Sequence, residues 1–153
     1  MKQRVLIVGA GWDQLPIIRA AQRLGHFVVA VDSNPRACGL EEADAAAIVS
    51  TRDAEGVLRT AKEFSVSAIT SMITESPLEA IHLAATQLDL PAPSRLSIEA
   101  TISKVRMREI FAAAGIPDVR FGCARTPTEA KRVAAEIGFP LVMKSADVGG
   151  QLG

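Results

Sequence analysis

The sequence is poor in the residues that nucleic-acid-binding proteins use. It contains no tyrosine, one tryptophan and five phenylalanines, so aromatic residues make up 4% of its 153 residues. Seventeen basic residues are balanced by seventeen acidic ones, which leaves no net charge. Binding to nucleic acid or to an anionic membrane surface calls for a basic patch, and binding to single strands calls for aromatic stacking platforms as well. Neither partner is therefore expected.

Cysteine and histidine are also scarce. Cys38 and Cys123 lie far apart and form no C-x-x-C pair, and the two histidines, His26 and His82, are isolated. This spacing argues against a zinc site and is typical of reduced thiols in a cytoplasmic protein. No apolar run has the length of a signal-peptide core or of a membrane span. Because 48% of the residues are hydrophobic, a packed core is expected instead.

Short apolar runs alternate with amphipathic segments through the first part of the chain. The runs read as strands at Val5–Val8, Phe27–Val31, Ala46–Val49 and Ser67–Thr70. Their residues are continuously apolar, a pattern typical of parallel strands that are covered on both faces. Right-handed crossovers between such strands build an open sheet with helices on both sides. The predicted fold class is therefore α/β, with a Rossmann-like, doubly wound parallel sheet.

Three helices are expected between these strands and after them. The first follows Gly11, buries one face made by Ile17, Ala21 and Leu24, and ends at Gly25. The second begins near Asp53. The third follows Ser76-Pro-Leu-Glu79, which has the form of a capping box with proline at the first helical position.

A proline-rich segment, Leu90-Pro-Ala-Pro-Ser94, divides the sequence. Residues 1–94 form the predicted Rossmann-like domain, and residues 95–153 form a second unit. In that unit we expect a helix over Ser103–Ala114, a strand over Val119–Cys123, a capping box at Thr126-Pro-Thr-Glu129 and a strand over Leu141–Met143. This stretch is too small to bury a core of its own, so the edge near Leu141–Lys144 should be exposed and unpaired.

The first strand ends in Gly9-Ala-Gly11, a partial dinucleotide-binding fingerprint. In the complete motif a third glycine or alanine lies three residues after the second, but this position is Gln14 here. NAD binding is therefore disfavoured, and a simple tight turn is favoured. Asp32, at the end of the second strand, is expected to fix a loop or cap a helix. Glu75 follows the fourth strand at the carboxyl edge of the sheet, where α/β proteins bind ligands, although a solvated acid is the simpler interpretation.

Two lysines of the second unit stand out. Lys104 lies in the first turn of its helix, where the helix dipole opposes a positive charge. It either contacts an anion or extends to solvent from a packed edge, and its spacing leaves both readings open. Lys144 directly follows an apolar strand and precedes Gly149, Gly150 and Gly153. Such glycines allow backbone amides to approach phosphates, but an ordinary turn with an exposed lysine has the same pattern.

Taken in order, these segments resemble the ATP-grasp superfamily along essentially the whole chain. The first part is similar to its N-terminal, pre-ATP-grasp domain, and the second to the start of the ATP-grasp domain, an incomplete α+β segment. Carbamoyl-phosphate synthase large subunits, biotin carboxylase and purine-pathway carboxylate–amine ligases share this layout. The matching segments are Val8–Ile17, Val31–Pro35, Glu42–Asp44, Ala68–Thr70, Ser103–Pro117, Glu129–Ala130 and Ile137–Lys144.

The resemblance implies ATP-dependent C–N ligation through an acyl phosphate, carbamoyl-phosphate synthase-like. The implied partners are ATP, Mg²⁺, a small carboxylate or bicarbonate, and an amine. By position, Lys104 and Lys144 match the two lysines that hold ATP phosphates in the family. The covering loop matches Asp147–Gly153, and Asp147, Gly149, Gly150 and Gly153 are its candidate cofactor-binding residues. Three residues depart from the usual pattern: Ser103, Ser145 and Leu152.

The resemblance also implies what these residues lack. The family's adenine-binding strand, its acidic magnesium ligands and its second substrate-binding half follow the glycine loop. We therefore expect this chain to be an N-terminal portion of a longer ligase, without catalytic residues or a tightly bound cofactor of its own. The alternative is a non-catalytic, Rossmann-like binding module that contributes to homo-oligomer contacts. An NAD-binding or nucleotide-sugar-binding protein is a third reading, which Gln14 disfavours.

Overall fold

The computed structural model describes residues 3–146 of the 153-residue chain. The chain divides into two compact units, Met1–Ser94 and Arg95–Gly153. Each is described by itself below as unit 1 and unit 2.

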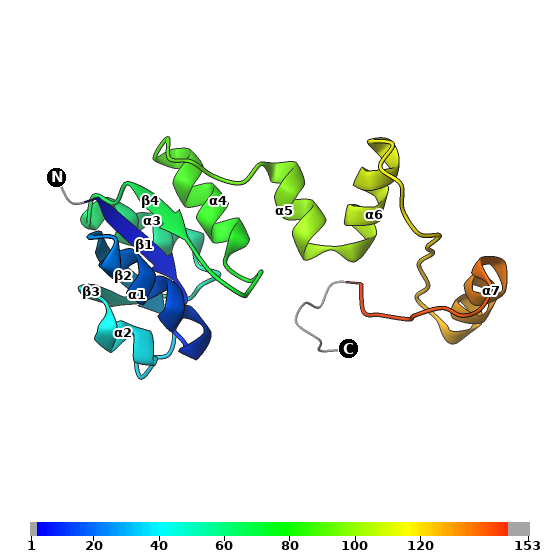
Figure 1. Cartoon of the computed structure of the whole chain (residues 1–153), viewed down its shortest axis with the longest axis horizontal. Helices are drawn as coiled ribbons and strands as arrows, with labels where there is room; N and C mark the ends of the chain where they lie inside the picture. Colours follow the sequence, from blue (N-terminus) through cyan, green and yellow to red (C-terminus); the bar gives the residue numbers. More distant parts are fainter. Residues whose placement is uncertain (1–2, 147–153) are drawn as a thin grey trace. The chain divides into compact units, whose positions relative to one another are not determined.

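Unit 1 is built on a four-stranded sheet (Figure 1). The strands are β1 (Arg4–Val8), β2 (Phe27–Asp32), β3 (Ala45–Ile48) and β4 (Ala68–Thr70). Their order is β3-β2-β1-β4, and all three neighbouring pairs are parallel. The predicted doubly wound parallel sheet is therefore confirmed. Because the order reverses at β1, the loops after β1 and β4 lie at its topological switch point.

Helices cover both faces of this sheet. Alternate residues of β1 point to opposite sides, so Ile7 packs in one cluster and Leu6 and Val8 in the other. The Ile7 side is covered by α1 (Leu15–Arg23) and α2 (Cys38–Glu42). The Leu6 side is covered by α3 (Ala54–Glu63) and α4 (Leu78–Gln87). A short 3-10 helix, η1 (Trp12–Gln14), precedes α1. Helix α2 was not predicted from the sequence.

Two helix ends in unit 1 follow the expected chemistry. The carboxylate of Asp53 accepts a hydrogen bond from the Gly56 amide at 3.0 Å, so Asp53 caps α3, the helix that was expected to begin near it. Gly25 follows α1 with a φ of 83°, a conformation that glycine adopts without steric cost. The start of α3 and the end of α1 thus lie at residue types that are typical of helix termini.

Two details of the predicted helices in unit 1 are wrong. Leu24 is 76% exposed because it lies after the last residue of α1, as its C-cap, whereas Ile18 is buried. Ser76 does not cap α4: the N-cap residue is Pro77, which has no side chain to accept a bond. The Ser76 hydroxyl instead lies 3.3 Å from that of Thr74.

Unit 2 contains three helices among the described residues. These are α5 (Arg95–Ile102), α6 (Lys104–Ala113) and α7 (Pro127–Ile137). Thr126 caps α7 by accepting from the Glu129 amide at 3.2 Å. The reciprocal bond of the predicted capping box is displaced by one residue, because Glu129 accepts from the amide of Arg125. Half of that box is therefore confirmed.

The strands predicted at 119–123 and 141–143 do not form in the part of unit 2 that the structure describes. Their sequences are apolar enough, yet Val142 and Met143 are 78% and 83% exposed. A strand is defined by ladder hydrogen bonds, and within residues 95–146 neither segment lies in a ladder. The exposed segment near Leu141–Lys144 was expected, but its strand geometry was not observed.

Candidate functional site

The glycine turn after β1 is closed by its own side chains. Gly9 has a φ of 100°, which turns the chain away from the strand. The Ala10 amide then donates to Asp32 Oδ2 at 2.8 Å, and the Gly11 amide donates to Gln14 Oε1 at 3.1 Å. A dinucleotide pyrophosphate needs free amides in such a turn. Two of the amides here are already satisfied, which supports the prediction of a simple tight turn.

Asp32 has the loop-fixing role that its position predicted. While Oδ2 holds the Ala10 amide, Oδ1 accepts from the amide of Asn34 at 2.9 Å. Both carboxylate oxygens are therefore used to join the loop after β2 to the turn after β1. In this arrangement the carboxylate is occupied by backbone rather than presented to a ribose.

The two loops at the switch point are tied together across the sheet edge. Gln14 Nε2 donates to the carbonyl of Met72 at 2.8 Å, and the Ser71 hydroxyl donates to the carbonyl of Val8 at 2.7 Å. We call residues 9–14 and 71–76 the switch-point loops. They lie where open α/β sheets bind ligands.

The switch-point loops expose two apolar side chains. Trp12 is 80% exposed, and Ile73 is 69% exposed with a φ of 68°. A β-branched residue in the left-handed region is a strained position, and strain of this kind concentrates at functional sites. Glu75 is half-buried in the same loop. The switch-point loops thus carry an exposed aromatic side chain, an exposed aliphatic side chain and a half-buried carboxylate.

In unit 2, Lys104 lies at the start of α6. The Ser103 hydroxyl caps this helix by accepting from the Arg106 amide at 3.4 Å. The Lys104 amide donates to the carbonyl of Ala146 at 2.9 Å. Ala146 is two residues beyond Lys144, so this bond brings the first turn of α6 beside the chain that carries the second lysine.

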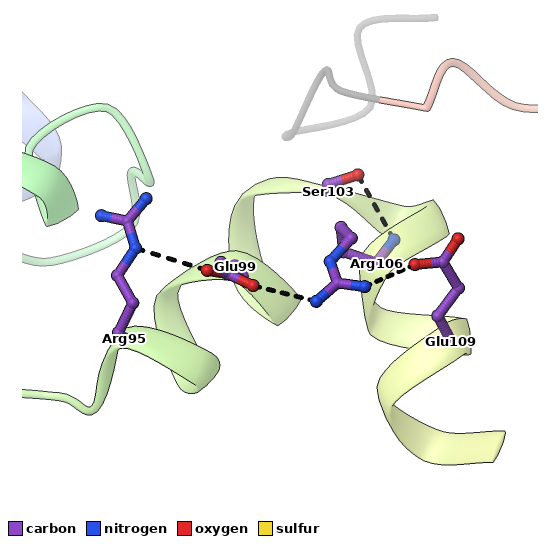
Figure 2. Close-up of polar contacts among 5 residues, drawn as sticks. All are labelled: Arg95, Glu99, Ser103, Arg106 and Glu109. Atoms are coloured by element: carbon purple, nitrogen blue, oxygen red, sulfur yellow. Dashed lines mark hydrogen bonds and ion pairs between the residues drawn. The ribbon is translucent and has the colours of Figure 1, made fainter. Parts of the chain in front are cut away.

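An ion-pair network spans the junction of α5 and α6 next to Lys104. Figure 2 shows Glu99 between two arginines, Arg95 and Arg106. One carboxylate oxygen of Glu99 lies 3.4 Å from Arg95 Nε, and the other lies 3.1 Å from Arg106 Nη2. Arg106 also donates to Glu109 at 2.6 Å. The hydrogen bond from Arg106, with that from Arg95 as a smaller cause, holds the pKa of Glu99 below its ordinary value. The pairs join the last turn of α5 to the first turns of α6.

Of the other residues predicted to contact phosphate, only Lys144 lies within the described residues. Lys144 is described and exposed. Asp147, Gly149, Gly150 and Gly153 lie outside the described residues. The structure thus joins the backbone beside Lys104 to that beside Lys144, while the glycine loop stays a prediction.

Sequence reasoning missed an open groove of about 560 Å³ in unit 2, between α6, residues 116–122 and α7. Apolar side chains of Ile116, Phe121 and Val133 line it, and an ion pair between Arg108 and Asp118 lies at its wall. The spacing of Arg108 and Asp118 in sequence carries no periodic signal, because a turn separates them. Only the fold could place them together.

No group of three or more histidine, cysteine or acidic side chains within residues 3–146 is placed to hold a metal ion. Nor does any helix in those residues have the length and hydropathy needed to cross a membrane.

The chain is similar in sequence to formate-dependent phosphoribosylglycinamide formyltransferases. The enzyme of Synechococcus elongatus is 30% identical over 145 residues, which cover 94% of this chain and 37% of the relative. This chain therefore spans little more than a third of the length of such relatives. No protein-family model matches it.

Solved structures share the fold. N5-carboxyaminoimidazole ribonucleotide synthetase from Thermotoga maritima superimposes with a TM-score of 0.78 at 20% identity, covering 96% of this chain and 39% of that one. L-amino acid ligase from Bacillus licheniformis gives 0.68 at 19% identity, covering 84% and 34%. The aligned part includes the parallel sheet of unit 1, because each match covers most of this chain. By sequence and by fold, the chain is thus similar to ligases of the ATP-grasp superfamily, as its motifs predicted, and resembles their N-terminal, Rossmann-like domain with the segment that follows.

Proposed function

We propose that this chain is the N-terminal portion of an ATP-dependent carboxylate–amine ligase that acts through an acyl phosphate. In this proposal Lys104 and Lys144 hold ATP phosphates, and the switch-point loops of unit 1 contribute a wall to the site of the non-nucleotide substrate. The name of the Synechococcus elongatus relative contains a carboxylate, formate, and an amine-bearing substrate, phosphoribosylglycinamide. This pairing supports carboxylate–amine ligation in preference to a carbamoyl-phosphate synthase-like reaction.

One observation carries the proposal: the 2.9 Å bond from the Lys104 amide to the Ala146 carbonyl. Phosphoryl transfer depends on positioning and on neutralising the charge of the phosphates. Two lysines on adjacent backbone segments would supply such positive charge. The capped first turn of α6 and the network around Glu99 keep the Lys104 backbone in one place.

Mg²⁺, when bound to ATP, would neutralise phosphate charge. The described residues hold no cluster of acidic side chains fit to ligate it. The contribution that we propose for residues 3–146 is phosphate binding and the substrate wall.

The proposal is tested by ATP titration of the longest natural chain that contains this sequence. Lys104→Ala and Lys144→Ala should each weaken ATP binding about 10- to 100-fold, the loss of one charge-assisted contact of about 1.5–3 kcal/mol. Lys131→Ala, which removes an exposed lysine from α7, is the matched control and should leave the affinity unchanged. Unchanged affinity in both test variants would show that the two lysines do not hold ATP.

The strained, exposed Ile73 and the exposed Trp12 also favour a second candidate, a non-catalytic binding module. A thermal-shift titration of the 153-residue chain separates the two. Stabilisation by ATP supports the ligase portion, since a ligand that binds only the folded state raises its stability. Stabilisation by small organic acids or amines alone supports the binding module.

A further inference from the structure

Gln14 is a buried polar side chain with both ends of its amide in use. It is 8% exposed, and its oxygen accepts from the Gly11 amide at 3.1 Å while its nitrogen donates to the Met72 carbonyl at 2.8 Å. No buried side-chain nitrogen or oxygen among the described residues lacks a partner. Burying an amide is favourable only when its hydrogen bonds are made, so these two bonds define its position.

The same side chain lies directly over the glycine turn. A Cβ added to Gly9 would meet Gln14 Cγ and Cδ at 3.5 Å, and one added to Gly11 would meet Gln14 Oε1 at 3.2 Å. In dinucleotide-binding turns, glycines leave this space open so that a pyrophosphate can approach the backbone. Here the space is occupied by the amide of Gln14, and its oxygen takes the Gly11 N–H that a phosphate would use.

We propose that Gln14 is a specificity-determining residue that closes the β1 turn to phosphate-bearing ligands and fastens it to the loop after β4. The oxygen of Gln14 stands in for a ligand's phosphate oxygen, and its nitrogen holds the opposite loop. The switch-point loops can therefore accept only ligand groups that place no phosphate at this turn. This inference concerns unit 1 alone and does not depend on ATP binding by Lys104 and Lys144.

The chain provides its own probe for a test. Trp12 is the only tryptophan, the sequence has no tyrosine, and Trp12 lies two residues from Gln14 on the exposed side of the turn. Tryptophan fluorescence therefore reports on this turn alone. The probes to titrate are inorganic pyrophosphate and ADP-ribose, against the unaltered chain, Gln14→Gly and Gln14→Ala.

Gln14→Gly restores glycine at the third fingerprint position, and Gln14→Ala separates loss of the side chain from added backbone freedom. Both variants should bind pyrophosphate at least about tenfold more tightly than the unaltered chain. The matched control is Gln22→Ala, because Gln22 Nε2 also donates to a backbone carbonyl, that of Glu42, at 2.8 Å. It should leave binding unchanged. Equal binding by all four proteins, or no binding by folded Gln14 variants, would overturn the proposal.

Amide hydrogen exchange provides a second, ligand-free measurement. In Gln14→Ala the Gly11 amide loses its acceptor, so its exchange should quicken about tenfold or more, whereas Gln22→Ala should leave it unchanged. Exchange of the amides of β1 serves as the check that each variant is folded. An unchanged Gly11 exchange rate in folded Gln14→Ala would show that the side chain does not close the turn.

Discussion

Both units contain apolar runs and amphipathic segments, but they differ in how many side chains they bury. Every buried apolar side chain among the described residues lies in unit 1, with the single exception of Ile98. Neither α6 nor α7 has a buried residue, although both carry apolar stripes. Leu141–Met143 is as apolar as the core of β1, yet it forms no strand. An apolar pattern thus becomes a strand only where a neighbouring strand completes the ladder.

The two units also differ in how their loops and side chains are held in position. Unit 1 is a self-sufficient scaffold whose loops are fixed by hydrogen bonds of Asp32, Gln14 and Ser71. Unit 2 places its lysines through local devices instead: the Ser103 cap, the Lys104–Ala146 backbone bond and exposed ion pairs. Contacts of that kind are individually weak, so unit 2 is the more readily deformed of the two.

The largest expected effect is a core truncation in unit 1. Leu6 is fully buried in β1, and Leu6→Ala should destabilise the fold by about 2–5 kcal/mol because it leaves a cavity that the sheet cannot fill. Leu96 in α5 is 54% exposed, and Leu96→Ala should change stability by less than about 0.5 kcal/mol. Urea unfolding followed by circular dichroism measures both.

The difference between these leucine variants is the sharpest test of the comparison between units. A large loss of stability in Leu96→Ala would mean that unit 2 buries a core of its own. A small loss in Leu6→Ala would mean that the parallel sheet tolerates a cavity and is not the stable part of the molecule.

Helix caps should have a smaller effect. Asp53 and Thr126 each cap a helix by accepting from the amide three residues on, at 3.0 Å in α3 and 3.2 Å in α7. Replacing either by alanine should cost its helix about 1 kcal/mol. In Asp53→Ala the cost should appear in the global unfolding free energy, since α3 packs on the core. In Thr126→Ala it should appear as local fraying of α7, measured by hydrogen exchange, with an unchanged global transition.

The sequence was sufficient for the parallel sheet and most helices of unit 1, because apolar runs, glycine ends and the Asp53 cap all agree there. It failed at the end of α1, where Leu24 lies after the last helical residue and is exposed, while Ile18 is buried. It also missed α2, whose five residues are too few to show a helical period. Local patterns of a few residues do not determine such short elements.

For the candidate site, the sequence identified Gln14 as an unusual residue but not its hydrogen-bond partners. Met72 is 58 residues away in sequence, so this contact exists only once β1 and β4 are neighbours. Asp32 was anticipated as a loop-fixing residue because its place after β2 restricts its reach. The groove beside Arg108 and Asp118 had no sequence signal at all. The sequence thus shows which residue types are unusual at a position, whereas contacts across a sheet edge or a turn can be identified only from the folded structure.

The smallest effect concerns two exposed ion pairs, one in each unit. Arg19 binds Glu42 through two bonds of 2.5 and 2.7 Å, and the stronger influence, the hydrogen bond, lowers the pKa of Glu42. The pKa of Glu99 is lowered by Arg106 and Arg95. A carboxyl whose folded-state pKa is lowered adds stability above its unfolded value, about pH 4.3, and loses that contribution as the pH falls through the lower folded value.

Both carboxyls should therefore titrate at lower pH in the folded chain than in an unfolded peptide, as measured by NMR of the side-chain carbons. The consequence differs between units. Because α2 packs on the sheet, Glu42→Gln should weaken the acid dependence of global unfolding, whereas the neighbouring exposed control Glu41→Gln should not. Glu99→Gln should alter only helix content at the α5–α6 junction. If Glu99→Gln shifted the global acid transition as much as Glu42→Gln, the two units would unfold as one cooperative body.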